Sequence, residues 1–529
     1  MKIAQFSTND INGGAAVASY RLFLGLDKKA DVDYFVRNKA LKNENIIKLP
    51  YKAQENIVQS SYINKNRTKL SNTLFSFTNE ITTLPDLSKY DIINLHWIEH
   101  FLSLENLQHL VNLKKPIIWT LHDQKPFTGG CHYTAGCERF IDDCINCKQL
   151  IVDEKKLPQT MLNLKKEIFK YANLTIVTPS KWLSDEARKS ALFQNKEVFT
   201  IANSVDCELF KKRKNAKERF NIDKNSVVLS FGVVSHIEKR KGFDELYKAL
   251  EIVKNRVKNI DIVGLIFGKN TSELPIRTID VGYLDNEIDL SYIYSASDFF
   301  ILPSLEDNLP NVILESMACG TPVVAFDTGG AKDIIDDSNG IIVPKGDINK
   351  LAESIITMIQ KKELRDKKSI QARERILAEF QFHHQAEKYL ELYNNLLQKP
   401  FKYQTNITKI DDAFDDLYGY IIRKYPQNNN LLFSKYFNNF NKQMENFKIS
   451  SDSYIIYGNG TISKTIKALI PDKIVGHVDM AEKDNHPQNL KNLKYDKIII
   501  SVLGREESIV KYLVEELNIC EDKIVRFDI

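Results

Sequence analysis

Short runs of β-branched and aromatic residues alternate with longer amphipathic stretches along most of this chain. The first set of runs is KIAQFS, DIINLHW, PIIWTLH, LTIVTP and VFTIAN. The rhythm restarts after Asn203 with SVVLSFG, DIVGLIFG, DFFILP, TPVVAF and GIIVP. Such alternation is typical of parallel sheets wrapped by helices. We therefore predict an α/β fold in which two doubly wound sheets face each other across a cleft.

The pattern divides the chain into five segments. Residues 1–200 and 201–380 are the two predicted Rossmann-like domains. The charged helical stretch at 381–399 fits a closing helix, and the Asn-rich and Lys-rich stretch at 400–450 fits a helical connector. Residues 451–529 contain YIIYGNG, KIVGHVD, KIIISVL and KIVRFD, which predict a small C-terminal α/β domain.

Composition is that of a folded globular protein and excludes several classes. Of the 529 residues, 43% are hydrophobic and 27% are charged, and a net charge of +4 gives no reason to expect a nucleic-acid partner. The start MKIAQFSTND lacks the apolar stretch of a signal peptide, and no run of about 18 apolar residues follows. We expect a cytoplasmic protein. Basic stretches at 65–69 and 155–166 leave open a peripheral contact with the inner face of the cytoplasmic membrane, although such runs usually lie on solvated faces.

The segment PSLEDNLPNVILESMACGTPVV joins a buried strand to a helix and places Glu315 in the first turns of that helix. Acidic groups there can accept hydrogen bonds from sugar hydroxyls while backbone N–H groups face an anion. A sugar and a diphosphate would suit this place. The alternative is that Glu315 only caps its helix.

This segment resembles the signature of the retaining glycosyltransferases of family 4, which have the GT-B fold. That signature is a Glu, seven residues and a second Glu before Ala-Cys-Gly-Thr-Pro-Val. On this resemblance Glu315 contacts the nucleotide ribose, and Asp307, in place of the usual first Glu, contacts the donor sugar. A one-residue shift of the loop would bring in Glu306 instead. The resemblance covers about residues 1–400, and it assigns the rest of the motif to donor binding: Asn308, Leu309 and Thr321.

Upstream, SFGVVSHIEKRKGFDEL places Gly232 at the end of a strand and Arg240 and Lys241 before a helix. Two cations at a helix start can neutralise a diphosphate leaving group without a metal. A KRK run otherwise lies on a solvated face. The pair resembles the Arg/Lys pair of the family, although the family spaces its cations further apart, so Ser235 or His236 is the alternative for the Arg position.

Glycines at strand ends add to the resemblance. Gly13 and Gly14 follow the first strand, where backbone can approach the donor phosphates. Gly282 and Leu284 resemble the segment whose backbone meets the nucleobase, and the pair at 329–330 resembles the turn after the phosphate loop.

Two histidines also stand at predicted strand ends. His122 and Asp123 follow IIWTL, and His96 follows IINL. The resemblance assigns the ring or backbone of His122 to the donor sugar near the reacting carbon, while the residues alone allow a structural role. We expect His96 to shape the acceptor pocket and Asp123 either to orient His122 or to meet the acceptor hydroxyl.

Four cysteines cluster in GGCHYTAGCERFIDDCINCKQL: Cys131, Cys137, Cys144 and Cys147. Four thiolates can close a tetrahedral structural zinc site, and the alternatives are free thiols or a redox-sensitive pair. No cofactor is expected for catalysis itself. The segment from TLHD to CINC resembles a subgroup of family 4 that builds bacterial exopolysaccharides and lipopolysaccharides.

The C-terminal IYGNGTISKTIKAL has part of a dinucleotide fingerprint, with Asp479 near the expected spacing, but Ser463 stands in place of the third Gly. A cofactor site and a scaffold or partner-binding role both remain open for this module.

The resemblance implies a metal-independent, retaining transfer of a sugar from a UDP-type or GDP-type donor to a surface glycan or lipid-linked acceptor. Two alternatives are a nucleotide-sugar epimerase of GT-B fold, which needs no acceptor, and an inactive nucleotide-sugar-binding scaffold in which Asp307 marks lost activity.

Overall fold

The computed structural model describes residues 1–52, 63, 66–68, 74, 81–153, 156–233, 238–268, 273–284, 286–399, 446–447, 450–457, 466–467, 470–480, 485–501 and 506–526. Several predicted features lie outside these residues: Lys65, Lys69, Lys155, Ser235, His236, Ser463 and nearly all of the connector at 400–450. The chain forms two compact units, one of residues 1–53 and 63–408 and the other of residues 54–62 and 409–529.

The first unit opens with a seven-stranded parallel sheet in the order β3-β2-β1-β6-β7-β8-β9. Its strands are β1 (Lys2–Asn9), β2 (Asp31–Asn38), β3 (Ile46–Lys48), β6 (Ile92–Leu95), β7 (Ile117–Thr120), β8 (Leu174–Thr178) and β9 (Glu197–Thr200). The helices are α1 (Gly14–Leu26), α3 (Leu104–Asn112), α4 (Leu157–Phe169) and α5 (Lys181–Lys189). Strands β4 (Tyr51–Lys52) and β5 (Ile81–Thr82) pair separately and antiparallel.

A second parallel sheet in the same unit has the order β12-β11-β10-β13-β14-β15. Its strands are β10 (Val227–Val233), β11 (Ile262–Gly268), β12 (Arg277–Asp280), β13 (Phe299–Leu302), β14 (Val323–Phe326) and β15 (Gly340–Val343). Its helices are α6 (Ala216–Arg219), α7 (Phe243–Arg256), α8 (Glu287–Ala296), α9 (Asn311–Ala318), α10 (Ala331–Ile334), α11 (Ile348–Gln360) and α12 (Lys362–Glu379). Both sheets reverse their strand order beside the first strand, as Rossmann sheets do.

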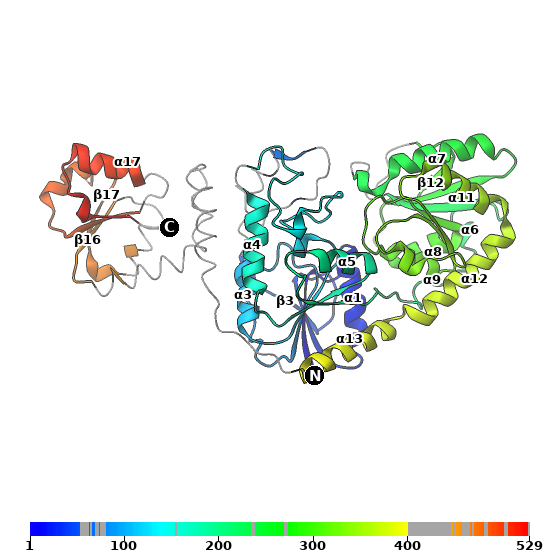
Figure 1. Ribbon diagram of the computed structural model, residues 1–529, viewed down its shortest axis with the longest axis horizontal. Helices are drawn as coiled ribbons and strands as arrows, with labels where there is room; N and C mark the ends of the chain where they lie inside the picture. The colour runs from blue at the N-terminus through cyan, green and yellow to red at the C-terminus, as the bar shows by residue number, and fades with distance from the viewer. Residues whose placement is uncertain are drawn as a thin grey trace. The chain divides into compact units, whose positions relative to one another are not determined.

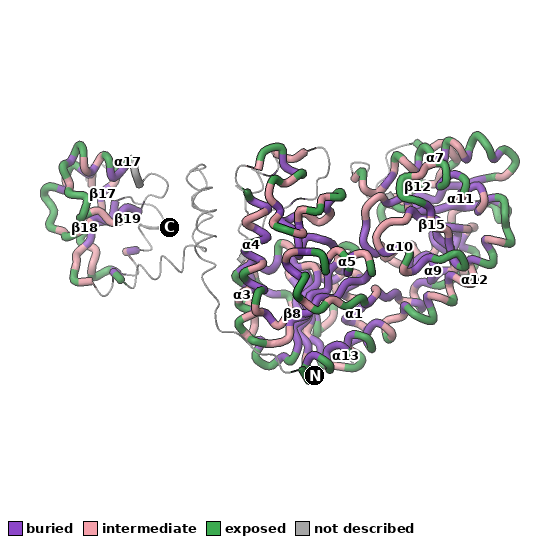
Figure 2. The backbone as a smooth tube through the Cα atoms, viewed as in Figure 1, coloured by how far each residue is buried: buried purple, intermediate pink, exposed green. Residues whose placement is uncertain are grey.

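The central strands of both sheets are buried on both faces, as Figure 2 shows. Every residue of β6, β7, β8 and β14 is buried. Such strands need apolar side chains in both directions, which explains the unbroken apolar runs in the sequence.

After α12 the chain returns to the first sheet through α13 (Phe382–Gln398), drawn in yellow in Figure 1. Tyr389 and Tyr393 of α13 are fully buried in the same core as α1 and β1. A Cβ at Gly25 would stand 2.7 Å from the Phe382 carbonyl oxygen, so α1 and α13 approach closely. Helix α13 therefore closes the core of the first sheet with residues that follow the second.

The second unit contains a parallel sheet in the order β17-β16-β18-β19. Its elements are β16 (Tyr454–Tyr457), β17 (Ile474–Val478), β18 (Lys497–Ile500), α17 (Glu506–Lys511) and β19 (Ile524–Arg526). Strands β16 and β18 are its buried centre. The predicted fold class, two doubly wound sheets and a small C-terminal α/β domain, is confirmed. Among the described helices, none has the length and apolar character needed to cross a membrane.

Candidate active site

The predicted site residues come from the carboxyl ends of strands in both large sheets, where open α/β sheets bind ligands. His96 follows β6 and His122 follows β7, while Asp307 follows β13. Hydrogen bonds join these ends across the two sheets. The Asn308 amide donates to the His122 carbonyl at 3.0 Å, and the Asn311 amide donates to the Gly14 carbonyl at 2.9 Å. The two carboxyl edges therefore form one site.

Asp307 lies buried beside the predicted cations. The Lys241 ammonium is 2.6 Å from Asp307 Oδ2, the Arg240 guanidinium is 3.9 Å from the same oxygen, and the Asn308 backbone N–H donates to Oδ1 at 3.0 Å. Burial would raise the pKa of the Asp307 carboxyl, but Lys241 and Arg240 outweigh it and hold that pKa below its usual value. Asp307 is therefore an anion held between two cations.

A loop of the first domain also contacts this cluster. The Tyr133 hydroxyl donates to Asp307 Oδ1 at 3.4 Å, and the Arg240 guanidinium lies 4.6 Å from the centre of the Tyr133 ring. The backbone N–H of Ala135 donates to a Glu306 carboxyl oxygen at 2.9 Å. Burial raises the pKa of Glu306. Glu306 thus binds the neighbouring loop, while Asp307 faces the cations.

Glu315 is paired with a cation that the sequence motifs did not reveal. Arg21 of α1 donates to Glu315 Oε1 at 2.8 Å and to Glu287 Oε1 at 2.8 Å. The Tyr294 hydroxyl donates to Glu315 Oε2 at 3.3 Å. Burial raises the pKa of Glu315 even though Arg21 opposes that shift. The one signal for Arg21 is its place as the single charged residue of the apolar helix GAAVASYRLFLGL.

One guanidinium nitrogen of Arg21, Nη1, is buried and has no hydrogen-bond partner among the described residues. A buried donor without a partner is costly, commonly about 1–3 kcal/mol. Arg21 therefore has donor capacity to offer a ligand beside Glu315.

Two helices begin at this site without side-chain caps. Helix α9 starts after Pro310, and α1 starts after Gly13, whose φ is 101°. Asn311, the first residue of α9, contacts the Gly14 carbonyl, so the two helix starts are adjacent. Uncapped helix starts present backbone N–H groups and the positive end of the helix dipole, which favour an anion.

Two further glycines are fixed by close contacts. Gly242, which immediately precedes α7, has φ of 69°, and a Cβ there would overlap the Pro303 carbonyl oxygen. Gly329 has φ of 56°, and a Cβ there would overlap the backbone oxygens of Asp307 and Asn308. Only glycine fits both positions. At each of them the backbone therefore packs directly against the β13–α9 loop.

His122 and His96 form a hydrogen-bonded pair whose proton positions can be assigned. Thr120 donates to Asn94 Oδ1 at 3.0 Å, which turns the amide nitrogen of Asn94 toward His96 Nε2 at 3.1 Å. An amide nitrogen only donates, so His96 Nε2 accepts and Nδ1 carries the proton. His96 Nδ1 then donates to His122 Nε2 at 3.0 Å, which leaves the His122 proton on Nδ1.

Both rings are neutral near pH 7. Burial lowers the pKa of His122 to about 4 and the pKa of His96 well below its usual value. A neutral ring with its proton on Nδ1 makes His122 a hydrogen-bond donor rather than a cation.

Asp123, for which we predicted contact with either His122 or the acceptor, is bound within its own domain. Its Oδ2 accepts from Trp97 at 3.1 Å and lies 2.5 Å from His132 Nδ1, and its Oδ1 accepts from the Lys125 backbone N–H at 2.9 Å. Burial would raise the pKa of Asp123, but His132 outweighs it and the pKa falls. Asp123 therefore braces the loop that follows β7.

Other predicted donor residues lie at different depths. Gly232 ends β10, and Gly282, with φ of 76°, follows β12 beside the partly buried Leu284. Leu309 is buried in the core under α9. Thr321 precedes β14, at the amino edge of the sheet, and its hydroxyl donates to the Tyr294 carbonyl at 2.6 Å. The Thr321 side chain thus satisfies a buried carbonyl away from the carboxyl edge, which gives it a structural role in place of the predicted donor contact.

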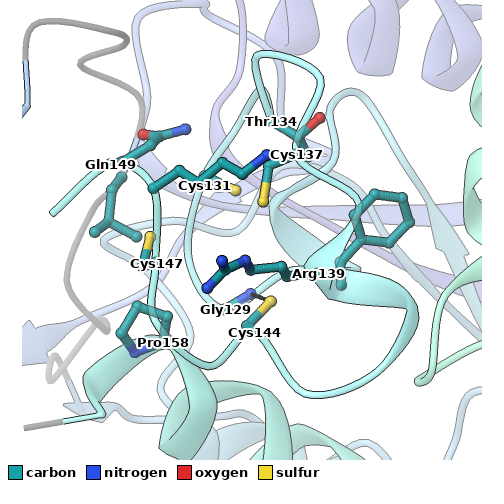
Figure 3. Close-up of a pocket in the computed structure, with 12 residues that line it drawn as sticks. Gly129, Cys131, Thr134, Cys137, Arg139, Cys144, Cys147, Gln149 and Pro158 are labelled. Carbon is teal, nitrogen blue, oxygen red and sulfur yellow. Dashed lines mark hydrogen bonds between the residues drawn. The ribbon is translucent and has the colours of Figure 1, made fainter. Parts of the chain in front are cut away.

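The four clustered cysteines line one pocket in the loop between β7 and α4, with Gly129, Arg139 and Pro158 among the other lining residues (Figure 3). As these side chains are placed, no three His, Cys, Asp or Glu residues of the described chain are arranged to hold a metal ion.

Solved structures share the architecture of the first unit. The sucrose-phosphate synthase of Thermosynechococcus elongatus aligns with a TM-score of 0.53 and 19% identity, covering 75% of this chain and 98% of that one. Anabaena HepE in complex with UDP-glucose aligns with a TM-score of 0.51 and 15% identity, covering 75% of this chain and all of that one. The fold is GT-B, as the resemblance implied.

In the sequence comparison, residues 226–361 of the second domain match the family model for Glycosyl transferases group 1. An uncharacterized glycosyltransferase of Haemophilus influenzae is 27% identical over 42% of this chain and 62% of its own length. The capsular polysaccharide biosynthesis glycosyltransferase CapM of Staphylococcus aureus is 25% identical over 45% of this chain and 66% of its own length. The chain thus spans just under two thirds of these two relatives. The putative colanic acid biosynthesis glycosyl transferase WcaC of Escherichia coli is 22% identical over 67% of this chain and 90% of its own length.

Proposed function

We propose that this protein is a retaining, metal-independent glycosyltransferase of family 4 that transfers a sugar from a nucleoside diphosphate donor to a surface glycan or lipid-linked acceptor. The group 1 match supports this proposal because it includes Arg240, Lys241, Asp307 and Glu315. The relatives support it because several are named for glycosyl transfer in polysaccharide biosynthesis.

One observation carries the proposal. The ion pair of Lys241 and Asp307 lies at the uncapped start of α9, and Glu315 lies within that helix. A diphosphate would lie against Lys241, Arg240 and the helix start, because cations and free N–H groups both favour it. Glu315 would then accept the ribose hydroxyls.

On this proposal, donor binding replaces ion pairs that are already present in the protein. Lys241 pairs with Asp307 and Arg21 pairs with Glu315 before the donor arrives. A diphosphate would draw Lys241 from Asp307 and free that carboxylate for sugar hydroxyls. A ribose would share Glu315 with Arg21, whose Nη1 still has no partner among the described residues. The charged side chains of the site are therefore already ordered before the ligand binds and takes the place of their present partners.

The chemistry that fits these groups is a front-face substitution. The bond from the anomeric carbon to the diphosphate breaks, an oxocarbenium-like species forms, and the acceptor oxygen attacks from the same face. The leaving phosphate takes the acceptor proton. The protein contributes positioning and charge stabilisation, with Lys241 and Arg240 at the developing negative charge and neutral His122 as a donor to the sugar.

Relatives suggest which donor and acceptor to try first. HepE was solved with UDP and with UDP-glucose, so UDP sugars are the first choice. A Campylobacter jejuni relative, 26% identical over 40% of this chain, is named as a transferase acting on a diphospho-undecaprenol acceptor. A lipid-linked acceptor would bring this protein to the inner face of the cytoplasmic membrane, which flotation with anionic vesicles would detect.

The test is a transfer assay in excess EDTA with a panel of UDP and GDP sugars and an undecaprenyl diphosphate glycan acceptor. The proposal expects one donor family to be consumed only with acceptor, and NMR of the product to retain the anomeric configuration. Lys241→Met should abolish transfer, while the neighbouring exposed Lys239→Met should not. Donor cleavage without acceptor would favour the epimerase, and donor binding without turnover would favour the inactive scaffold.

A further inference from the structure

The loop between β7 and α4 brings four cysteines to one pocket. Cys131 and Cys137 come from its first half, and Cys144 and Cys147 from the C-x-x-C turn at its end. Figure 3 shows the four cysteine side chains around the pocket, with the Arg139 side chain among them.

Backbone N–H groups near the C-x-x-C turn form hydrogen bonds with cysteine sulfur atoms. The Gly129 backbone N–H donates to Cys144 Sγ at 3.2 Å, and the Gln149 backbone hydrogen-bonds to Cys147. Sulfur accepts weakly as a thiol, but a metal-bound thiolate is a strong acceptor that such N–H groups orient. These contacts resemble an outer shell already built for thiolate ligands.

The same turn is strained. Cys144 has φ of 60° and Asn146 has φ of 52°. Left-handed backbone at a non-glycine residue costs on the order of 1 kcal/mol or more and persists only where the surroundings fix it. Arg139 contributes to that fixation because its guanidinium donates to the carbonyls of Ile145 and Asn146.

Cations surround the cluster. Arg139 and Lys148 line the pocket, and the buried Lys165 ammonium donates to the carbonyl of Thr128, which precedes Gly129 of the pocket lining. Four thiolates around a divalent ion carry a net charge of about −2, and nearby cations offset that charge. The environment therefore suits a tetrathiolate centre.

We propose that Cys131, Cys137, Cys144 and Cys147 bind one structural zinc ion in a tetrahedral site made of their four thiolates. An all-sulfur set of four ligands favours zinc over calcium or magnesium, and it leaves no open position for catalysis. Each thiol loses its proton to solvent as its sulfur binds, so four protons leave for each zinc ion that enters. In their present positions no three of these side chains are arranged to hold a metal ion, so zinc binding requires the thiol side chains to change rotamer.

The site also has a consequence for the proposed transfer reaction, and this part rests on that function. The segment between the first two ligands carries Tyr133 and Ala135, which contact Asp307, Arg240 and Glu306. A zinc ion would hold both ends of this segment. Tyr133 is then a positioning residue for the cation cluster, and loss of zinc should raise the donor KM more than it lowers kcat.

The test begins with zinc content, which does not depend on activity. Full-length protein expressed with zinc and purified without chelators should contain about one zinc per chain, and X-ray absorption should give four sulfur ligands at about 2.3 Å. Cys144→Ser should lose zinc, and Cys520→Ser, which alters an exposed cysteine of the other unit, should keep it. Because Cys144→Ser could unfold, Cys137→His offers a second variant that should retain zinc with three sulfur ligands and one imidazole ligand.

Wild-type protein with no more zinc than Cys144→Ser would overturn the proposal, as would oxygen or nitrogen ligands in the absorption spectrum. A disulfide between any two of the four cysteines, found by mass spectrometry of unreduced peptides, would also overturn it. Zinc bound in protein that transfers no sugar would leave the site standing and count against the glycosyltransferase. Transfer by wild-type protein that is isolated without zinc would overturn the site alone.

Discussion

Arg21 of α1 and Glu315 of α9 form a buried ion pair of 2.8 Å although 294 residues separate them. The pair links the first helix of one Rossmann-like domain to the motif helix of the other. It is also the contact that a nucleotide ribose would have to share on the proposed function.

Removing Arg21 should destabilise the protein strongly. In Arg21→Met the Glu315 carboxylate stays buried without its cation, so we expect the free energy of unfolding in urea to fall by about 3–5 kcal/mol. Arg21→Met combined with Glu315→Leu should recover part of that loss. The control is Arg256→Met, which removes an exposed pair with Glu353 and should change the free energy of unfolding far less. Equal losses of unfolding free energy in Arg21→Met and Arg256→Met would contradict this account.

Gly329→Ala should damage the donor loop. A Cβ there would overlap the backbone oxygens of Asp307 and Asn308, so the loop must move. The matched control is Gly346→Ala, at a similar φ of 74° but with no atom within 4 Å of the added carbon. We expect Gly346→Ala to lose about 1 kcal/mol from backbone strain, and Gly329→Ala to lose more and to weaken donor binding. Urea denaturation and donor titration of both variants measure the difference.

The neutral histidines predict how stability depends on pH. The pKa of His122 is about 4 in the folded protein, below its usual value of 6.5, so the unfolded chain binds more protons between these values. Stability should therefore fall as pH drops through that window, and His122 should account for about 2 kcal/mol of the loss between pH 7 and pH 4.5. His122→Asn should flatten the profile by that amount in urea denaturation. The exposed His109→Asn is the control, and identical profiles for His122→Asn and wild type would contradict the pKa assignment.

The sequence predicted the strands that are buried on both faces and the edge strands β9 and β15, but it missed β2 and β12. The runs IINL, IIWT and LTIVT are apolar throughout because β6, β7 and β8 are covered on both sides. By contrast β2 reads DVDYFVRN, and the edge strand β12 reads RTID. Charged residues interrupt both patterns, and only pairing with a neighbouring strand makes them extended.

The site residues also fall into two groups: those in a continuous sequence motif and those recognised only by contacts with residues distant in the sequence. Asp307, Glu315 and Lys241 could be predicted because their motifs are short and continuous in sequence. Arg21 and Tyr133 could not, since the residues they contact lie 294 and 174 positions away. Thr321 was assigned to donor binding because it belongs to the motif, but the motif continues past α9 to the opposite edge of the sheet.

The most direct test of the central claim is calorimetric titration of UDP and GDP into the wild-type protein in excess EDTA, alongside Lys241→Met, Glu315→Gln and the control Lys239→Met. We predict that one nucleotide binds with about one site per chain. Lys241→Met should weaken it roughly 10-fold to 100-fold, since a charge-assisted contact contributes about 1.5–3 kcal/mol. Glu315→Gln should also weaken it, and Lys239→Met should leave it unchanged. If neither nucleotide binds, or if both site variants bind as the wild type does, the interdomain site is not a donor site.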